Sequence, residues 1–309
     1  MPLIFNAHNG QEVMHVKDRT DLAVESAAGL AGTPEGVALE KENAGGAEIT
    51  WVRIDTEEAA RRIGKPCGNY WTLCHRELPL MDAQARMEIA RRVAETLRML
   101  LPKKGSVLVL GLGNRYMTAD ALGPRTVEGV LVTRQLQDRR LRSVSALSPG
   151  VMGVTGIETA ELAQSLADKL KPDAIIVIDA LAAMETGHIC TTIQVTDTGI
   201  RPGSGVGNHR QGITRETMNV PVIAIGVPMV VYASTIVRDT LRRLIAHEAS
   251  ADDAEIMADE LARSAPEDMV VTPRDIDEQV AGLGDLLALA INTALHPTIG
   301  MEALSHELH

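Results

Sequence analysis

Three short apolar runs mark the middle of the chain. Residues 107–110 read VLVL, residues 175–178 read IIVI and residues 222–225 read VIAI, without the polar alternation of a half-exposed strand. Strands buried on both faces of a sheet have this pattern, because neither face meets water. The runs therefore predict central strands of a mainly parallel or mixed sheet.

Apolar residues at helical spacing predict helices around these strands. One helix follows Asp82 and ends before Pro102, and another opens at residues 155–158, where TGIE has the spacing of a capping box. A third is predicted over residues 236–245, and residues 279–295 are the clearest part of a helical C-terminal segment. Buried strands alternating with amphipathic helices predict an α/β fold of three layers, a sheet with flanking helices.

The first hundred residues have a weaker pattern. Up to about residue 48 no period is sustained, which predicts an extended arm with loops. Residues 49–54 and 70–73 have the pattern of strands, with a short helix between them at residues 56–63. After a short N-terminal piece, we therefore divide the chain into an arm with a smaller strand-containing subdomain (22–103), an α/β core (104–247) and a C-terminal helical segment (248–309).

Composition narrows the class of protein. The chain has 309 residues, 45% of them apolar and 23% charged, which is enough for a large buried core. Its formal net charge is -11 and no Lys/Arg run tracks a phosphate backbone, which argues against direct nucleic-acid binding. No signal-peptide pattern and no apolar run of roughly 18 residues is present. We expect a cytoplasmic protein that does not bind membranes.

The cysteines and aromatic residues point away from a bound cofactor. Cys67, Cys74 and Cys190 are an odd number in a chain without a signal peptide, so we expect reduced thiols. The spacing of Cys67 and Cys74-His75 matches no common zinc site. Aromatic residues make up 2% of the chain, so there is no platform for stacking bases or sugars. We expect neither a metal nor a cofactor.

Two aspartates follow two of the predicted strands. Asp120 lies in the loop after the first strand, and Asp179 ends the second. Ligands and reactions gather at the carboxyl ends of strands in an α/β sheet. A pair of carboxyls that share a proton can hydrolyse a peptide directly, since one activates water while the other donates a proton. Alternatively, Asp120 is a cap or turn former and Asp179 binds loop amides, the commoner use of aspartate. Spacing alone leaves both open.

Glycine-rich loops follow the same strands. The GLG sequence at residues 111–113 invites a dinucleotide interpretation, but Tyr116 replaces the third glycine and Pro124 interrupts the expected helix. The loops at residues 148–159 and 201–210 expose backbone amides for a substrate strand or an oxyanion, or are merely turns. Ser204 lacks a nucleophile elbow, and a lone His209 is a weak candidate for a base or metal ligand. The candidate substrate-binding residues are Gly113, Asn114, Gly150, Met152, Gly153, Gly205, Asn208 and His209.

Several blocks of residues stand in order along the chain. They are GLGN (111–114), ADALGP (119–124), PGVMG with TGIET (149–153 and 155–159), IDAL (178–181), PGSGVGN (202–208) and VIAIGVP (222–228). Together they resemble the germination protease (spore endopeptidase) family of spore-forming Firmicutes. The resemblance extends from residues 20–25 through residues 64–66 to about residue 245.

The resemblance implies a protease of the forespore and spore core. Members of the family degrade the small acid-soluble proteins that coat spore DNA when the spore germinates. They are made as inactive tetrameric zymogens that remove a short N-terminal piece of themselves, and their fold is similar to that of hydrogenase-maturation endopeptidases. Two aspartates that are essential in the family match Asp120 and Asp179, so the resemblance favours the aspartate pair.

The resemblance also suggests where the chain cuts itself. The family's substrates are cut after an acidic residue in a stretch similar to Thr-Glu-(Ile/Phe)-Ala-Ser-Glu. Residues 20–25 of this chain read TDLAVE. We therefore predict self-cleavage between Asp21 and Leu22, with residues 1–21 as the propeptide.

Two alternatives remain at this stage. A hydrogenase-maturation-like endopeptidase directed by a metal in its substrate needs a third carboxylate or histidine, for which His209 is the nearby candidate. A nucleotide- or ligand-binding α/β module without catalysis predicts stabilisation by its ligand and no self-cleavage.

Overall fold

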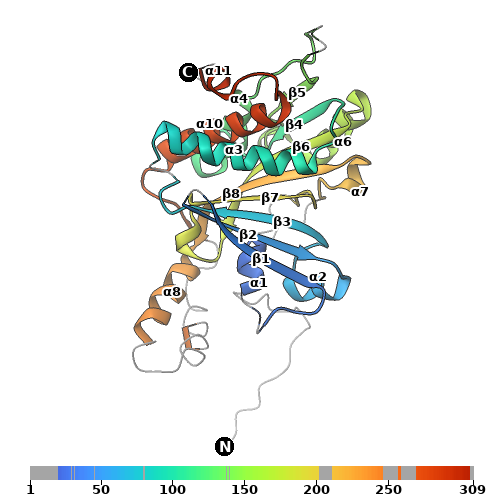
Figure 1. Ribbon diagram of the computed structural model, residues 1–309. Coiled ribbons are helices and arrows are strands. Elements are labelled where there is room, and N and C mark those ends of the chain that lie inside the picture. Colours follow the sequence, from blue (N-terminus) through green and yellow to red (C-terminus); the bar gives the residue numbers. More distant parts are fainter. Residues whose placement is uncertain are drawn as a thin grey trace, which may run out of the picture.

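A single mixed sheet organises the described part of the chain, which comprises residues 20–28, 30, 32–44, 46–78, 81–136, 138, 140–201, 211–245, 257–258 and 269–306 of the computed structural model (Figure 1). Its nine strands run in the order β1-β2-β3-β7-β8-β6-β4-β5, and β9 pairs with β8. The strands are β1 (Val37–Ala44), β2 (Ala47–Ile54), β3 (Gly68–Cys74), β4 (Val107–Gly111), β5 (Val144–Leu147), β6 (Ala174–Ala183), β7 (Thr192–Thr196), β8 (Val222–Tyr232) and β9 (Val270–Val271).

The three apolar runs form the centre of this sheet. They are β4, β6 and β8, which lie parallel to one another, with β5 parallel to β4 at the edge. All other pairs are antiparallel. The prediction of buried central strands in a mixed sheet is confirmed. The N-terminal strands continue this same sheet through β7, which pairs with both β3 and β8.

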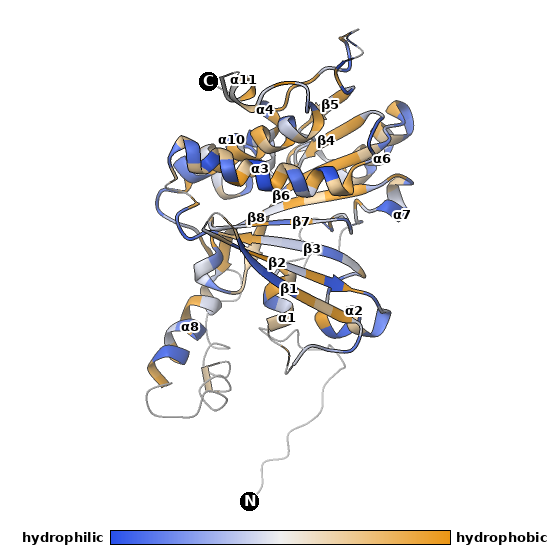
Figure 2. Cartoon of the chain, viewed as in Figure 1, coloured by the Kyte–Doolittle hydropathy of each residue, from blue (hydrophilic) through white to orange (hydrophobic). Residues whose placement is uncertain are grey.

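Helices cover both faces of the sheet and give the predicted three layers (Figure 1). Helices α3 (Ala83–Leu100), α4 (Leu122–Glu128) and α10 (Ile276–Leu295) pack on one face, and α10 is mostly apolar (Figure 2). Helices α6 (Thr159–Leu170) and α7 (Arg215–Met218) pack on the other face of the central strands. That second face continues under β2 and β3, where it packs against α1 (Ala23–Ala28) and α2 (Glu57–Ile63).

Side-chain caps begin two helices where the sequence predicts them. The side chain of Asp82 accepts a hydrogen bond from Ala85 N–H at the start of α3, and Thr56 caps α2 in the same way. The predicted capping box at Thr155 is wrong. Thr155 instead ends the short helix α5 (Met152–Thr155), Gly156 adopts a left-handed φ of 73°, and α6 begins four residues later at Thr159.

The arm predicted up to about residue 48 is also corrected. Within it the structure has helix α1 and strand β1, which pairs with β2 along its whole length. Most of β1 is exposed, so its sequence carries no apolar alternation. A solvated edge strand is held by backbone pairing, which leaves little trace in hydropathy.

The C-terminal part is helical with one short strand. Helix α8 (Ala233–Ile245) follows β8, α10 begins three residues before the predicted helix, and α11 (Met301–His306) ends the described chain. Strand β9 was not predicted. Among the described helices, none is long and apolar enough to cross a membrane.

The connection from β4 to α4 is packed so tightly that it requires glycine. A Cβ at Gly123 would lie 2.2 Å from the carbonyl oxygen of Leu112 and 2.7 Å from that of Ile178. The glycine at this position therefore allows α4 to pack directly against the sheet.

Replacing Gly123 tests this packing. We expect Gly123→Ala to lower the free energy of unfolding by about 3 kcal/mol, because the new methyl group meets backbone that cannot rotate away. Urea unfolding measures the change. Gly153→Ala is the matched control, since nothing lies within 4 Å of its added Cβ and alanine favours the helix by up to about 1 kcal/mol. Equal stabilities of the two variants would contradict the prediction.

Candidate active site

Asp120 closes the loop that follows β4. It ends a single 3-10 turn, η3 (Thr118–Asp120), and its Oδ2 accepts a hydrogen bond from the Asn114 N–H at 2.9 Å. Gly113 permits this closure, because its φ is 108° and a Cβ there would lie 2.0 Å from the carbonyl oxygen of Asp120. Gly113 and Asn114, predicted as substrate contacts, therefore shape the loop around this carboxylate.

Asp179 is buried in the middle of β6 and does not end the strand as predicted, because β6 continues four residues beyond it to Ala183, paired with β8. It is 8% exposed, and within the described part of the chain its carboxyl accepts one hydrogen bond, from the Ala180 N–H at 3.0 Å. Burial, and then the negative charges of Asp120 and Asp21, raise the pKa of Asp179 well above its ordinary value. Asp179 is therefore neutral at pH values where an exposed aspartate is ionised.

The structure brings the two predicted aspartates to the same edge of the sheet. Strand β4 ends at Gly111, which pairs with Ile178 of its parallel neighbour β6, so the loop after β4 begins beside Asp179. The Leu112 N–H donates to the Ile178 carbonyl at 2.8 Å, which fixes the loop of Asp120 against the residue before Asp179. Asp120 closes its own loop by accepting from Asn114 N–H, which agrees with the alternative of a turn former. Asp179, however, is a buried carboxyl whose pKa is raised by burial and by the negative charge of Asp120. The alternative does not explain this proximity of two carboxyls.

Residues 20–25 lie against the sheet beside this pair. The Asp21 N–H donates to the Ala182 carbonyl at 3.0 Å, and Asp21 Oδ2 accepts from the Ala182 N–H at 2.9 Å. Leu22 is completely buried among apolar residues of β6 and β8, including Leu181 and Val231. The bond predicted to be cut is thus held on the same strand as Asp179.

Gln194 of β7 binds the segment from its other side. Its Nε2 donates to the Asp21 carbonyl at 3.2 Å, and its Oε1 accepts from the Ala23 N–H at 2.8 Å. Because β8 lies between β6 and β7, the segment crosses the face of the sheet over β8.

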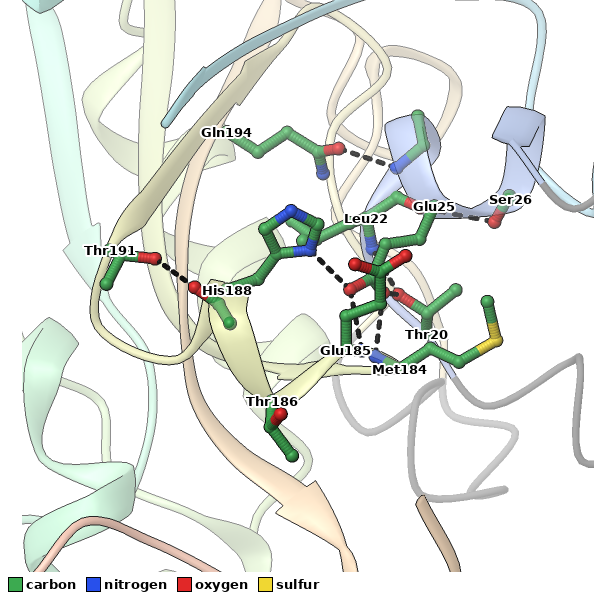
Figure 3. Close-up of polar contacts among 12 residues, drawn as sticks. Thr20, Leu22, Glu25, Ser26, Met184, Glu185, Thr186, His188, Thr191 and Gln194 are labelled. Atoms are coloured by element: carbon green, nitrogen blue, oxygen red, sulfur yellow. Dashed lines mark hydrogen bonds and ion pairs between the residues drawn. The ribbon is translucent and has the colours of Figure 1, made fainter. Parts of the chain in front are cut away.

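Glu25 anchors the far end of the segment (Figure 3). Its side chain is 1% exposed, and its oxygens accept hydrogen bonds from the N–H groups of Met184 at 2.7 Å and Glu185 at 2.9 Å. His188 Nδ1 lies 2.6 Å from Glu25 Oε1, and the Thr20 hydroxyl donates to Glu25 Oε2. The two ends of the TDLAVE sequence therefore meet in one buried cluster.

Two basic side chains offset the acids of the segment. Burial alone lowers the pKa of His188, but the hydrogen bond and charge of Glu25 outweigh it and raise the pKa above 6.5. The half-buried Lys65 donates from Nζ to the Thr20 carbonyl at 2.7 Å. Burial lowers the pKa of Lys65, while the charges of Asp21 and Glu25 oppose that change.

The remaining residues predicted to bind substrate either lie further from the aspartate pair or fall outside the described residues. Gly150, Met152 and Gly153 follow β5, the edge strand beyond β4, so they lie at the same edge of the sheet but one strand further out. Gly205, Asn208 and His209 lie outside the described residues, so their predicted roles, including that of His209 in a metal-directed endopeptidase, stay predictions. Exposed apolar side chains surround this edge: Tyr116, Met117, Met152, Val154 and Ile157.

Metal ligands and thiols add little to the described site. In the described ranges, no three His, Cys, Asp or Glu side chains gather in a way that could hold a metal ion. Cys67, Cys74 and Cys190 are free thiols, as predicted.

The sequence analysis missed the roles of Gln194, Glu25 and His188. Glu25 had a signal, because it ends the stretch similar to a substrate and lies four positions after Asp21, the acid at the predicted cut. Gln194 and His188 had none, since their contacts with residues 20–25 depend on strand pairing across the sheet.

Fold and site together define a class of protein, an α/β protein that holds a segment of its own chain beside a buried carboxyl. A family model described as germination protease matches residues 14–264. The chain belongs to the germination protease family, and it is a peptidase of spore germination.

Curated relatives support this assignment over nearly the whole chain. The germination protease of Caldanaerobacter subterraneus subsp. tengcongensis is 40% identical over 321 residues, covering 94% of this chain and 98% of that protein. That of Clostridium tetani is 37% identical (94% and 99% covered), and that of Bacillus cereus is 36% identical (92% and 95% covered).

A solved structure also aligns with part of the chain. It is the NiFe hydrogenase maturation protease HycI from Thermococcus kodakarensis KOD1, with a TM-score of 0.33 and 18% identity over 54% of this chain and 97% of that chain. The α/β fold class itself rests on the nine-stranded sheet and its flanking helices.

The ion pair between His188 and Glu25 predicts a pH-dependent stability. Because folding raises the pKa of His188, its contribution is full below the unfolded pKa of about 6.5 and is lost as pH rises through the folded pKa. We expect His188→Gln to cost about 2 kcal/mol at pH 5.5 and about 1 kcal/mol at pH 9. Urea unfolding at both pH values measures this, with His75→Gln as the matched control. A cost that is equal at both pH values would contradict the ion pair.

Proposed function

We propose that this peptidase cuts its own chain between Asp21 and Leu22 with the Asp120 and Asp179 carboxyls, and that the same pair then hydrolyses its protein substrates. One observation carries the proposal. The segment predicted to be cut is bound to β6 at Ala182, and the charge of Asp21 acts on Asp179.

The environments of the two carboxyls suggest their roles. The Asn114 N–H stabilises negative charge on Asp120, which suits a base. Burial keeps Asp179 protonated, which suits an acid. Asp120 takes a proton from water as the water oxygen bonds to the carbonyl carbon of Asp21. The C–N bond to Leu22 then breaks, and Asp179 gives its proton to the leaving nitrogen.

The binding of residues 20–25 supports substrates of similar sequence. Thr20 and Glu25 are the outer residues of TDLAVE, and both are buried, at 4% and 2% exposed. A substrate with an acid four residues after the one at the cut can use the same Met184, Glu185 and His188 contacts. This supports the small acid-soluble spore proteins as substrates, since the resemblance implies a Thr-Glu-(Ile/Phe)-Ala-Ser-Glu-like stretch in them.

The proposed setting follows from the same resemblance. The enzyme is stored in the forespore and spore core as a homotetrameric zymogen, with residues 1–21 as its propeptide. Its partners are the DNA-coating proteins themselves, and it does not bind nucleic acid or membranes directly. A net charge of -11 suits capture of a DNA-binding protein better than binding of DNA.

Removing either carboxyl tests the proposed mechanism. We expect Asp120→Asn and Asp179→Asn each to slow self-cleavage by about 10³-fold or more, because an amide neither activates water nor donates an acidic proton. Intact mass of the purified chain over time measures the loss of residues 1–21. Asp138→Asn is the matched control and is expected to process normally, because Asp138 is a partly exposed acid paired with Arg140. Trimming that is identical in all of these proteins would contradict the aspartate pair.

The raised pKa of Asp179 predicts a pH profile. Self-cleavage needs Asp179 protonated, so its rate falls as pH rises through the pKa of this residue, which lies above about 3.9. We expect faster processing at pH 5 than at pH 8. For the same reason the stability that goes with the neutral form is present at low pH and lost as pH rises, so Asp179→Asn is at least as stable as wild type at pH 8. A rate that climbs steadily from pH 5 to pH 9 would contradict this role.

A further inference from the structure

Gln194 binds the two peptide groups on either side of Leu22. The Asp21 carbonyl belongs to the peptide bond before Leu22, and the Ala23 N–H belongs to the one after it. A carbonyl only accepts and a backbone N–H only donates, so the orientation of the Gln194 carboxamide follows from its partners. The side chain is 6% exposed, which leaves these contacts sheltered from water.

The sheet register places Gln194 in line with Asp179. Asp179 is paired with Gly226 of β8, and Gly226 is paired with Gln194 of β7. Residues in register share a face, and neighbouring strands are about 4.8 Å apart, so the Asp179 and Gln194 backbones are roughly 10 Å apart across the sheet. Gly226 between them carries no side chain, and a Cβ there would lie 2.4 Å from Leu181 Cδ1.

Strands β6 and β7 both bind Asp21, from opposite sides. Asp21 binds β6 through its N–H and side chain, and it binds β7 through its carbonyl. The carbonyl of the bond predicted to be cut therefore points to Gln194, while the acid of the proposed pair lies on the opposite strand.

We propose that Gln194 is a catalytic residue that binds the carbonyl oxygen of the bond to be cut and aligns the main chain around it. The inference rests on the proposed function, because it takes the bond between Asp21 and Leu22 as the one hydrolysed. As water adds, this oxygen gains negative charge and the Nε2 donor holds it more strongly than it held the neutral carbonyl. The charge leaves the oxygen when the C–N bond breaks, so Gln194 itself is unchanged.

The contacts also define what Gln194 recognises. It binds main-chain atoms alone, so it sets the position of the bond without selecting side chains. Gln194 by itself accepts any extended peptide with an N–H at the second residue after the cut, so it excludes proline there because proline has no N–H. Selection for an acid further along is left to the contacts that bind Glu25.

Two substitutions at one position separate the functions of the carboxamide. Gln194→Met keeps the length and removes both contacts, and Gln194→Glu keeps an acceptor for the Ala23 N–H but loses the donor to Asp21 when ionised. We expect Gln194→Met to slow self-cleavage by about 10²-fold to 10³-fold, as removal of an oxyanion donor does. A protonated glutamate donates again, so the rate of Gln194→Glu relative to wild type is expected to rise about tenfold or more from pH 8 to pH 5.

The measurement is intact mass of the full chain over time, with Thr192→Val as the matched control. Thr192 lies on the same strand, is fully buried, and its hydroxyl has no hydrogen-bond partner among the described residues. Its variant is expected to process at the wild-type rate. A Gln194→Met rate within about threefold of wild type, or a Gln194→Glu ratio that does not change with pH, would overturn the inference. If Gln194→Met does not fold, the pH ratio alone decides.

Failure of the proposed function gives a different result. In that case wild type is not cut between Asp21 and Leu22, or Asp179→Asn is cut equally fast. Cleavage that depends on Asp179 but not on Gln194 leaves the aspartate pair in place and removes only the inference on Gln194.

Discussion

The cost of placing a carboxyl in an apolar sheet governs this structure. Asp179 continues a strand whose preceding residues are completely buried, and it has one hydrogen bond from Ala180 within the described chain. A charge in that position is expensive, so the carboxyl stays protonated over a wide pH range. The tight turn at Gly113 and Gly123 then brings Asp120 close, which raises the cost of ionising Asp179 further. The arrangement that buries Asp179 thus also places a second carboxyl, that of Asp120, beside it.

Residues 20–25 add buried negative charge near Asp179, and basic groups beside them offset part of it. Asp21 adds a third acid near Asp179, and Glu25 adds a buried one further along. Lys65 and His188 supply positive charge next to the same segment, and backbone amides of the loop after β6 stabilise Glu25. Buried charges are tolerated when they are paired and hydrogen-bonded. The segment is therefore held by charge at its ends and by apolar burial of Leu22 at its centre.

The central part of the fold could be predicted because its signals are local. Strands β4, β6 and β8 are apolar on both faces, and their position in the chain directed attention to Asp120 and Asp179. Strand β1 was missed because it is an exposed edge strand, and the helix start at Thr155 was wrong because the αL residue Gly156 ends α5 there. Gln194 was beyond prediction. Its position beside Asp21 depends on β7 pairing antiparallel between β3 and β8, and no local pattern reports that pairing.

The contacts of residues 20–25 also show that hydrolysis of the bond does not by itself release the bound segment from the site. On the proposed mechanism, hydrolysis between Asp21 and Leu22 breaks the connection to the propeptide but leaves Leu22 buried and Glu25 bound to its amides and to His188. A second peptide has to displace this remaining stretch, which competes as part of the same chain and hence at a high effective concentration. The cut leaves on the propeptide side the contacts of Asp21 with Ala182 and Gln194, the contact of Thr20 with Lys65, and the Thr20 side of its hydrogen bonds with Leu22 and Glu25. Release of the rest therefore depends on the burial of Leu22, the Gln194–Ala23 hydrogen bond and the Glu25 cluster. On this mechanism, the combined strength of these contacts sets how readily the processed enzyme accepts a substrate.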